Sequence, residues 1–112
     1  MEMIREFYSM TDRYAYDFGK CSYKNGFAQV DTSQDASYYG TWANPETLII
    51  VSYCEGDVTI KTADTVEEFV EELKAIKKWN DDNGYRFLGI DPGCGKALKA
   101  RFQAIGLGEL LH

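Results

Sequence analysis

The stretch TLIIVSYCEGDVTIKT, from Thr47 to Thr62, limits the possible folds of this chain most strongly. An apolar run and a second run rich in β-branched residues flank a Glu-Gly-Asp turn, which predicts a hairpin of Thr47–Cys54 with Val58–Thr62. The first run is continuously apolar over Leu48–Val51, so we expect that strand to be central and covered on both faces, or nearly so. The chain should therefore contain an antiparallel sheet.

The clearest helix follows this hairpin. Thr65 and Glu68 have the spacing of a capping box, in which two side chains satisfy free backbone donors at a helix start. Acidic residues come before basic ones along the segment, an order that complements the helix dipole, and Gly84 ends it. Phe69, Leu73 and Ile76 form its apolar stripe at i, i+4 and i+7, and Val66 and Val70 widen it. Whether Trp79 belongs to this stripe is left open by the sequence.

A second hairpin is predicted nearer the start of the chain. Aromatic residues alternate with polar or small ones in RYAYDFGK, the period-two pattern of a half-buried strand. Asn25-Gly26 follows, and Asn-Gly favours a two-residue hairpin turn because both of its positions need positive φ. We therefore expect a strand over Arg13–Tyr23 that pairs with a strand over Phe27–Thr32.

Near the C-terminus, YRFLGID predicts a short strand and GKALKARFQAIGLGELLH a second helix. Leu98, Phe102 and Ile105 form the apolar stripe of that helix, and Gly106 and Gly108 should break it. The 112 residues are enough for one domain, 1–112, with one core. The predicted fold class is α+β, with an antiparallel sheet of about four or five strands packed against two helices.

Charge limits the class of partner. Eighteen acidic residues against twelve basic ones give a net charge of −6, which argues against direct binding to a nucleic-acid backbone and favours a protein partner with a basic surface. No apolar run reaches the roughly 18 residues of a membrane span, and the first ten residues lack the pattern of a secretory signal. We expect a cytoplasmic protein that does not bind membranes.

Three widely spaced cysteines, Cys21, Cys54 and Cys94, fit neither a disulfide framework nor a close-spaced zinc site, and the one histidine is His112. Cys94 lies at the expected start of the last helix and two residues before Lys96. Both features favour a thiolate, so a small thiol or redox enzyme built on Cys94 is an alternative function. No histidine lies near it in the sequence to act as its base.

No cofactor or metal is predicted. Asp31, Ser33 and Asp35 have the alternate spacing that opens a calcium loop, but Ala36 and Trp42 occupy the positions that need glycine and glutamate. The GCGK stretch before the last helix lacks the first glycine and the magnesium-binding hydroxyl of a phosphate-binding loop.

One segment combines acidic and aromatic residues without any base: no lysine or arginine lies between Lys24 and Lys61. Such a face suits a basic partner, because carboxylates steer the encounter and Tyr and Trp provide anchors. The alternative is that the aromatic residues form the core, although two adjacent tyrosines in a strand cannot both point into it. Gly40 permits a bulge or a close backbone approach. The predicted contact residues are Tyr38, Tyr39, Trp42, Asp31, Asp35, Glu46, Glu55 and Asp57.

The runs QVDTSQDASYYGTWANP and VSYCEGDVT, with a helix that starts TVEEFVEE, resemble short uncharacterised proteins of phages and other bacterial mobile elements. The resemblance spans Ala28 to His112. It implies a setting in which small acidic domains are often inhibitors of host defence, anti-CRISPR proteins among them, that occlude a basic surface.

Our leading hypothesis is therefore a non-enzymatic protein-binding domain, in the setting of a phage-encoded inhibitor acting in the bacterial host. An accessory subunit of a permanent complex, or a homodimer that buries the same face, is a further alternative.

Overall fold

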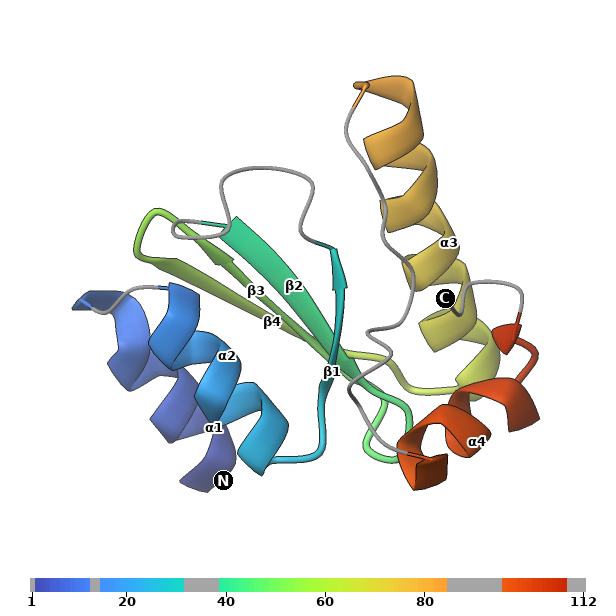
Figure 1. Ribbon diagram of the computed structural model, residues 1–112, viewed down its shortest axis with the longest axis horizontal. Coiled ribbons are helices and arrows are strands. Elements are labelled where there is room, and N and C mark those ends of the chain that lie inside the picture. The colour runs from blue at the N-terminus through green and yellow to red at the C-terminus, as the bar shows by residue number, and fades with distance from the viewer. Residues whose placement is uncertain (1, 13–14, 32–38, 85–95, 109–112) are drawn as a thin grey trace.

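A computed structural model describes residues 2–12, 15–31, 39–84 and 96–108 (Figure 1). One antiparallel sheet packs with helices, which confirms the predicted α+β class. The elements in chain order are α1 (Glu2–Tyr8), the 3-10 helix η1 (Ser9–Asp12), α2 (Ala15–Lys24), β1 (Ala28–Asp31), β2 (Tyr39–Asn44), β3 (Ile49–Cys54), β4 (Asp57–Thr62), α3 (Val66–Asp82) and α4 (Lys96–Ala104).

The sheet has the strand order β1-β2-β3-β4, and each neighbouring pair is antiparallel. β3 and β4 form the predicted central hairpin, in which Cys54 pairs with Asp57 across the turn Glu55-Gly56. The pairing of β1 with β2 is less regular, because its register shifts between Gln29 and Asp31. The two edges of the sheet therefore differ, with a bulged edge at β1 and a regular one at β4.

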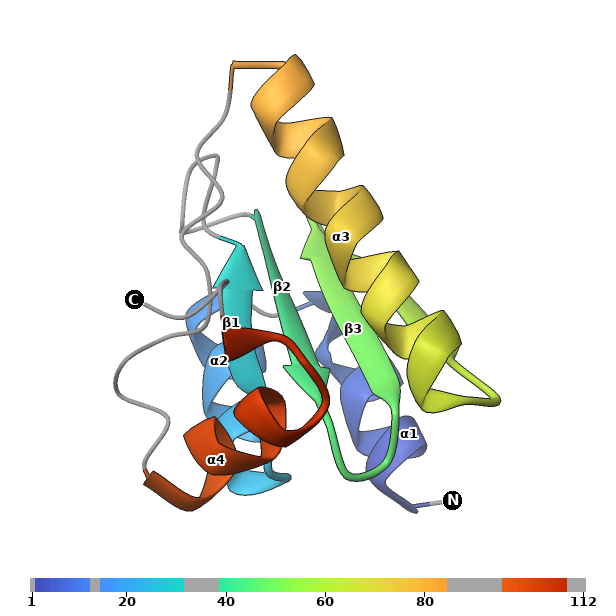
Figure 2. The same ribbon diagram turned by 90° about the vertical axis from the view of Figure 1, so that its right-hand side faces the viewer.

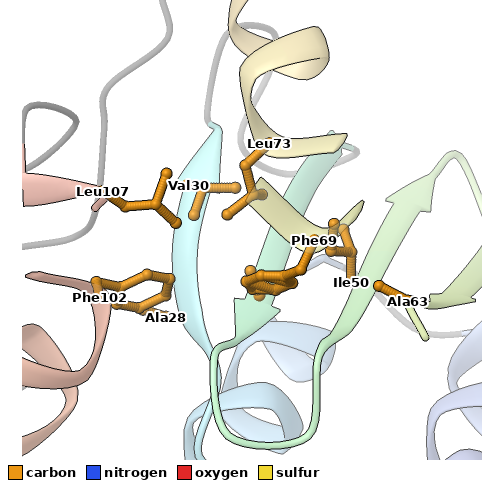
Figure 3. Packing of buried hydrophobic residues seen from close by; sticks show 9 residues of the cluster. Ala28, Val30, Ile50, Ala63, Phe69, Leu73, Phe102 and Leu107 are labelled. Atoms are coloured by element: carbon orange, nitrogen blue, oxygen red, sulfur yellow. The ribbon is translucent and has the colours of Figure 1, made fainter. Parts of the chain in front are cut away.

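Helices cover both faces of the sheet: α1 and α2 lie on one side, and α3 and α4 on the other (Figures 1 and 2). Each side has its own apolar cluster. The α1–α2 cluster contains Phe7, Phe18, Cys21, Phe27, Trp42, Ile49, Val51 and Tyr53. The α3–α4 cluster, shown in Figure 3, contains Ala28, Val30, Ala43, Ile50, Ala63, Phe69, Leu73, Phe102 and Leu107.

The strand β3 contributes to both clusters. Ile49, Val51 and Tyr53 point into the α1–α2 cluster, and Ile50 points into the α3–α4 cluster. Side chains alternate between the two faces of a strand, so a continuous apolar run is buried only when both faces are covered. The prediction of a central strand covered on both sides is confirmed over this part of β3.

The predicted strand over Arg13–Tyr23 is wrong, because Ala15–Lys24 is the helix α2. Among the side chains of α2 that the structure describes, Phe18, Cys21 and Ser22 are buried, and they follow the i, i+3, i+4 spacing of a helix face. Ser22 Oγ donates a hydrogen bond of 2.8 Å to the carbonyl oxygen of Phe18, so its polar atom is satisfied within the helix. The alternation of aromatic residues was not the pattern that determines burial here.

The Asn25-Gly26 pair ends this helix and does not form a hairpin turn. Gly26 has φ of +85°, its N–H donates to Tyr23 O at 3.2 Å, and Phe27 N–H donates to Ser22 O at 2.9 Å. This double pattern is a Schellman motif, which places a glycine of positive φ just after a helix. Asn-Gly can adopt the positive φ of either a hairpin turn or a Schellman motif, and in this protein it forms the Schellman motif at the end of α2.

The two predicted helices are present as α3 and α4, but the prediction of only two helices is wrong, because α1 and α2 form a further layer. Phe69 and Leu73 of the predicted stripe are buried, whereas Val66 and Trp79 are exposed. Thr65 caps α3, accepting a 3.1 Å hydrogen bond at Oγ1 from Glu68 N–H, while the carboxylate of Glu68 accepts from Asp64 N–H at 3.3 Å. Phe102 is the buried residue of α4, and Gly106 follows that helix with φ of +86°. The predicted strand YRFLGID lies outside the described residues.

Trp42 is buried in the α1–α2 cluster. Its ring lies 5.1 Å from that of Phe18, and it packs against the backbone of two glycines, Gly19 of α2 and Gly40 of β2. A β-carbon on Gly40 would lie 2.4 Å from Trp42 Cη2, and one on Gly19 would lie 3.4 Å from Trp42 Cζ2. The group that closely approaches the backbone of Gly40 is therefore the indole ring of Trp42, which lies in the same strand.

We expect Gly40→Ala to lower the free energy of unfolding by about 1–3 kcal/mol, because the new methyl group overlaps the indole of Trp42. Gly108→Ala is the matched control, since the nearest described atom to its β-carbon would be Gln103 Cγ at an ordinary 3.7 Å. Urea denaturation of both variants measures the difference. Equal losses in the two variants would contradict the packing described for Trp42.

Candidate functional site

One end of the sheet gathers several of the predicted contact residues. Tyr39 pairs with Cys54, and Cys54 pairs with Asp57, so the three form one row across β2, β3 and β4. By the alternation of strands, this row faces the same side as Ile50, and Glu55 lies beside it in the exposed turn. We call Tyr39, Cys54, Glu55 and Asp57 the acidic end of the sheet.

Trp42 is not part of this surface. It is 2% exposed and belongs to the α1–α2 cluster, on the face opposite the acidic end. The prediction that Trp42 contacts a partner is contradicted, because a side chain this buried offers no surface. Its indole Nε1 is buried and has no hydrogen-bond acceptor among the described residues. The ring is therefore positioned by its apolar contacts in the α1–α2 cluster.

Glu46 is also separate from the acidic end. It lies in the turn between β2 and β3, and its carboxylate pairs with Arg101 of α4 at 3.4 Å. The whole of β3 separates this turn from the one that contains Glu55, a span of roughly 17 Å for a six-residue strand. Glu46 is therefore an exposed, ion-paired acid at the opposite end of the sheet.

The remaining predicted contact residues have little or no described structure. Asp31 pairs with Thr41 as the last residue of β1, and only its backbone is described. Tyr38 and Asp35 lie outside the described residues.

Glu55 has an unusual backbone conformation. Its φ is +49°, in the left-handed region that residues other than glycine and asparagine seldom adopt. Leu48 is the other such described residue, with φ of +61°, and its side chain packs against the α3–α4 cluster. Glu55 has no such packing, since it is exposed. Burial therefore explains the strained conformation of Leu48 but not that of Glu55.

The charges of the acidic end are uncompensated within the part of the chain that the structure describes. Glu55 and Asp57 are both exposed, and neither carboxylate has an ion pair with a described base. Burial of the thiol raises the pKa of Cys54, and the negative charges of Glu55 and Asp57 raise it further. The acidic end thus presents two exposed carboxylates and a protonated thiol beside the half-buried Tyr39.

A group of hydroxyl side chains, which the sequence reasoning missed, continues this surface along the same face. Thr41 pairs with Ser52, and Ser52 pairs with Thr59 on β4. Thr41 Oγ1 and Ser52 Oγ lie 3.3 Å apart, close enough for a hydrogen bond. The signal in the sequence is the change from apolar to polar residues at every second position of β3, from Ile50 to Ser52 and Cys54. This face therefore becomes polar toward the acidic end.

The second described thiol, Cys21, lies in a cleft of about 310 Å³ between α1 and α2. Its Sγ donates to Glu6 Oε1 at 3.0 Å, and Lys24 Nζ contacts the same carboxylate oxygen at 3.2 Å. Burial and the hydrogen bond to Glu6 raise the pKa of Cys21 to about 12. Hydrogen bonds from Cys21 and Lys24 lower the pKa of Glu6, which makes this carboxylate a weak base.

The chemistry of the cleft does not indicate a particular ligand. Its lining consists of Glu6, Met10, Asp17, Lys20, Cys21 and Lys24. Two acids and two lysines balance in charge, and the thiol stays protonated at neutral pH. Cys94, on which the thiol-enzyme alternative depends, lies outside the described residues.

Comparison with known proteins gives no relative: no family model, curated protein or solved structure matches this chain. Within the described ranges, no three or more His, Cys, Asp or Glu side chains gather as a metal site would require. None of the helices described here combines the length and the apolar character needed to span a membrane.

We expect the stability of the protein to fall above pH 9 through Cys21. The folded pKa of about 12 lies above the usual value of 9.0, so between these values the unfolded chain loses a proton that the folded protein keeps. The free energy of unfolding should then fall by about 1.4 kcal/mol per pH unit. The stabilisation that comes from Cys21 is fully present below pH 9 and is lost as the pH rises toward 12. Chemical denaturation over this pH range measures the slope. A Cys21→Ala variant that kept the same slope would contradict this assignment.

Proposed function

We propose that this chain is a small acidic protein-binding domain whose partner presents a basic surface, and that the acidic end makes the contact. The observation that carries the proposal is the exposed Glu55 at φ of +49°. Glu55 and Gly56 both have positive φ, as the two central residues of a type I′ turn require. Asparagine or glycine would relieve the backbone strain at this position, so the carboxylate is kept at a cost in stability.

The neighbours of Glu55 support the same function. Asp57 adds a second exposed carboxylate without a described ion pair, and Tyr39 supplies an aromatic ring at the other side of the row. Two exposed acids beside a tyrosine suit a surface rich in lysine and arginine, which they would attract before close contact forms. The hydroxyl groups of Ser52 and Thr59 add hydrogen-bonding groups on the same face.

The resemblance to proteins of phages and mobile elements suggests where such a partner would be found. In that setting the partner is a component of a bacterial defence complex, and the domain acts as an anti-CRISPR-like inhibitor in the cytoplasm of the host. Defence complexes that handle nucleic acids expose basic surfaces, and a negatively charged domain occludes them without binding nucleic acid itself. The proposed action is steric and electrostatic, so it needs no catalytic residue and no cofactor.

The variant Glu55→Asn separates binding from folding. It removes one charge and creates an Asn-Gly turn, so the free energy of unfolding should rise by about 1 kcal/mol. Affinity for the partner should fall about two- to fivefold, with a weaker dependence on salt, because one exposed charge is lost. Partners are identified by capture from a bacterial lysate and mass spectrometry, and affinity is then measured with the purified partner.

Glu46→Gln is the matched control, because it removes the same charge at the opposite end of the sheet. It should leave partner affinity unchanged. If Glu55→Asn and Glu46→Gln had equal effects on affinity, the contribution would come from net charge alone, and the acidic end would not be the contact surface.

A further inference from the structure

We propose that the outer edge of β4 binds the same edge of a second copy of this chain, in an antiparallel pairing centred on Thr59. The two four-stranded sheets would then join into one sheet of eight strands. This inference rests on the geometry of β4 and does not depend on the partner proposed above.

The two edges of the sheet differ in how open they are to pairing. β1 has four residues and a shift in register, and short or bulged strands resist addition of another strand. β4 has six residues, pairs with β3 without any shift, and contains no proline. Four of its six residues are exposed. The β4 edge therefore has the length and regularity that strand addition needs.

The backbone of β4 has groups available for this pairing. Cys54 and Asp57 flank a two-residue turn, and such a flanking pair exchanges both of its backbone hydrogen bonds. By alternation, the backbone groups of Val58, Ile60 and Thr62 point away from β3. These three residues make no backbone hydrogen bond to another described segment.

In one register, the side chains of β4 are complementary to those of β4 in a second copy. With Thr59 opposite Thr59 of the second copy, Asp57 lies opposite Lys61 and Val58 lies opposite Ile60, and symmetry repeats both pairs. In this register Val58 and Ile60, whose backbone N–H and C=O groups point away from β3, form the hydrogen-bonded pairs of the junction. A shift by two residues in either direction would place Asp57 or Lys61 opposite Thr59, so opposite charges select this register.

The environment of these side chains suits the pairing. Val58 and Ile60 are half-buried and pack against the α1–α2 cluster, together with Met3 and Met10 of the N-terminal helices. Across the new junction, Ile60 of the second copy would continue this apolar layer.

Lys61 already forms an ion pair with Glu72 of α3, and its side chain remains half-exposed. An ammonium group has three donors, so it can bind a second carboxylate from the other copy. An isolated lysine on an edge strand repels an identical edge, whereas Asp57 at the matching position removes that repulsion.

A charge swap tests the register. The wild-type chain should show a concentration-dependent dimer in sedimentation equilibrium. Asp57→Lys places two like-charged pairs at the junction and should weaken the dimer at least about tenfold, while the double variant Asp57→Lys, Lys61→Asp restores opposite charges and most of the affinity. Thermal unfolding checks that each variant is folded. A wild-type chain that stays monomeric up to its limit of solubility, or a double variant no tighter than Asp57→Lys, would overturn the proposal.

A disulfide trap tests the centre of the junction. Facing residues of a non-hydrogen-bonded antiparallel pair have Cα atoms roughly 4.5 Å apart, within the range that a disulfide can bridge. In a background of Cys54→Ser and Cys94→Ser, Thr59→Cys should form a covalent dimer on mild oxidation. Thr47→Cys, an exposed threonine in the turn between β2 and β3, should not. Equal cross-linking of the two variants, or none with Thr59→Cys, would show that β4 does not pair with itself.

The same measurements distinguish this inference from the proposed function. Glu55→Asn leaves the Asp57–Lys61 pairs unchanged, so it should weaken partner binding without changing the dimer. A loss of dimer in this variant would show that the turn, and not the pairing of β4, controls self-association, and would count against the proposed register.

Discussion

Burial of β3 on both faces is the constraint on which the rest of the structure depends. Val51 is fully buried against the α1–α2 layer and Ile50 against the α3–α4 layer, so neither helical layer is optional. A sheet of four strands with one bare face would expose one of these two rows to water. The chain meets this requirement from its two ends, with an N-terminal pair of helices for one face and a C-terminal pair for the other (Figure 1).

This constraint also separates what the sequence predicts from what it does not. The central hairpin and the capped helix after it depend on local signals, a two-residue turn and Thr65 with Glu68, and these act the same way in any context. The helix α2 depends on where Phe18 and Cys21 point, which is decided by the face of β3 that they cover. Asn25-Gly26 fits a hairpin turn or a Schellman cap equally well, so only the tertiary structure selects between them.

The same reasoning explains why only part of the candidate site is predictable. Composition marks the segment that lacks bases, but it does not distinguish an aromatic anchor from a core residue. Trp42 belongs to the core because Gly19 and Gly40 leave room for its ring, and this depends on two segments far apart in the sequence. The strain at Glu55 is a property of the backbone, for which the sequence gives only the indirect sign of a Glu-Gly turn.

Asp57 belongs both to the acidic end and to the edge of β4, so self-association and partner binding involve the same carboxylate. Pairing of β4 uses the carboxylate of Asp57 for Lys61 of the second copy and leaves the exposed Glu55 outside the junction on each subunit. The two copies of Glu55 would then lie on opposite sides of the Thr59 axis, eight residue steps apart, or roughly 26 Å. A dimer with two separated acidic ends binds best to a partner that repeats its basic surface at a matching spacing, because the second contact forms within an already bound complex. Self-association would therefore convert a weak electrostatic contact into a selective one for repetitive basic assemblies.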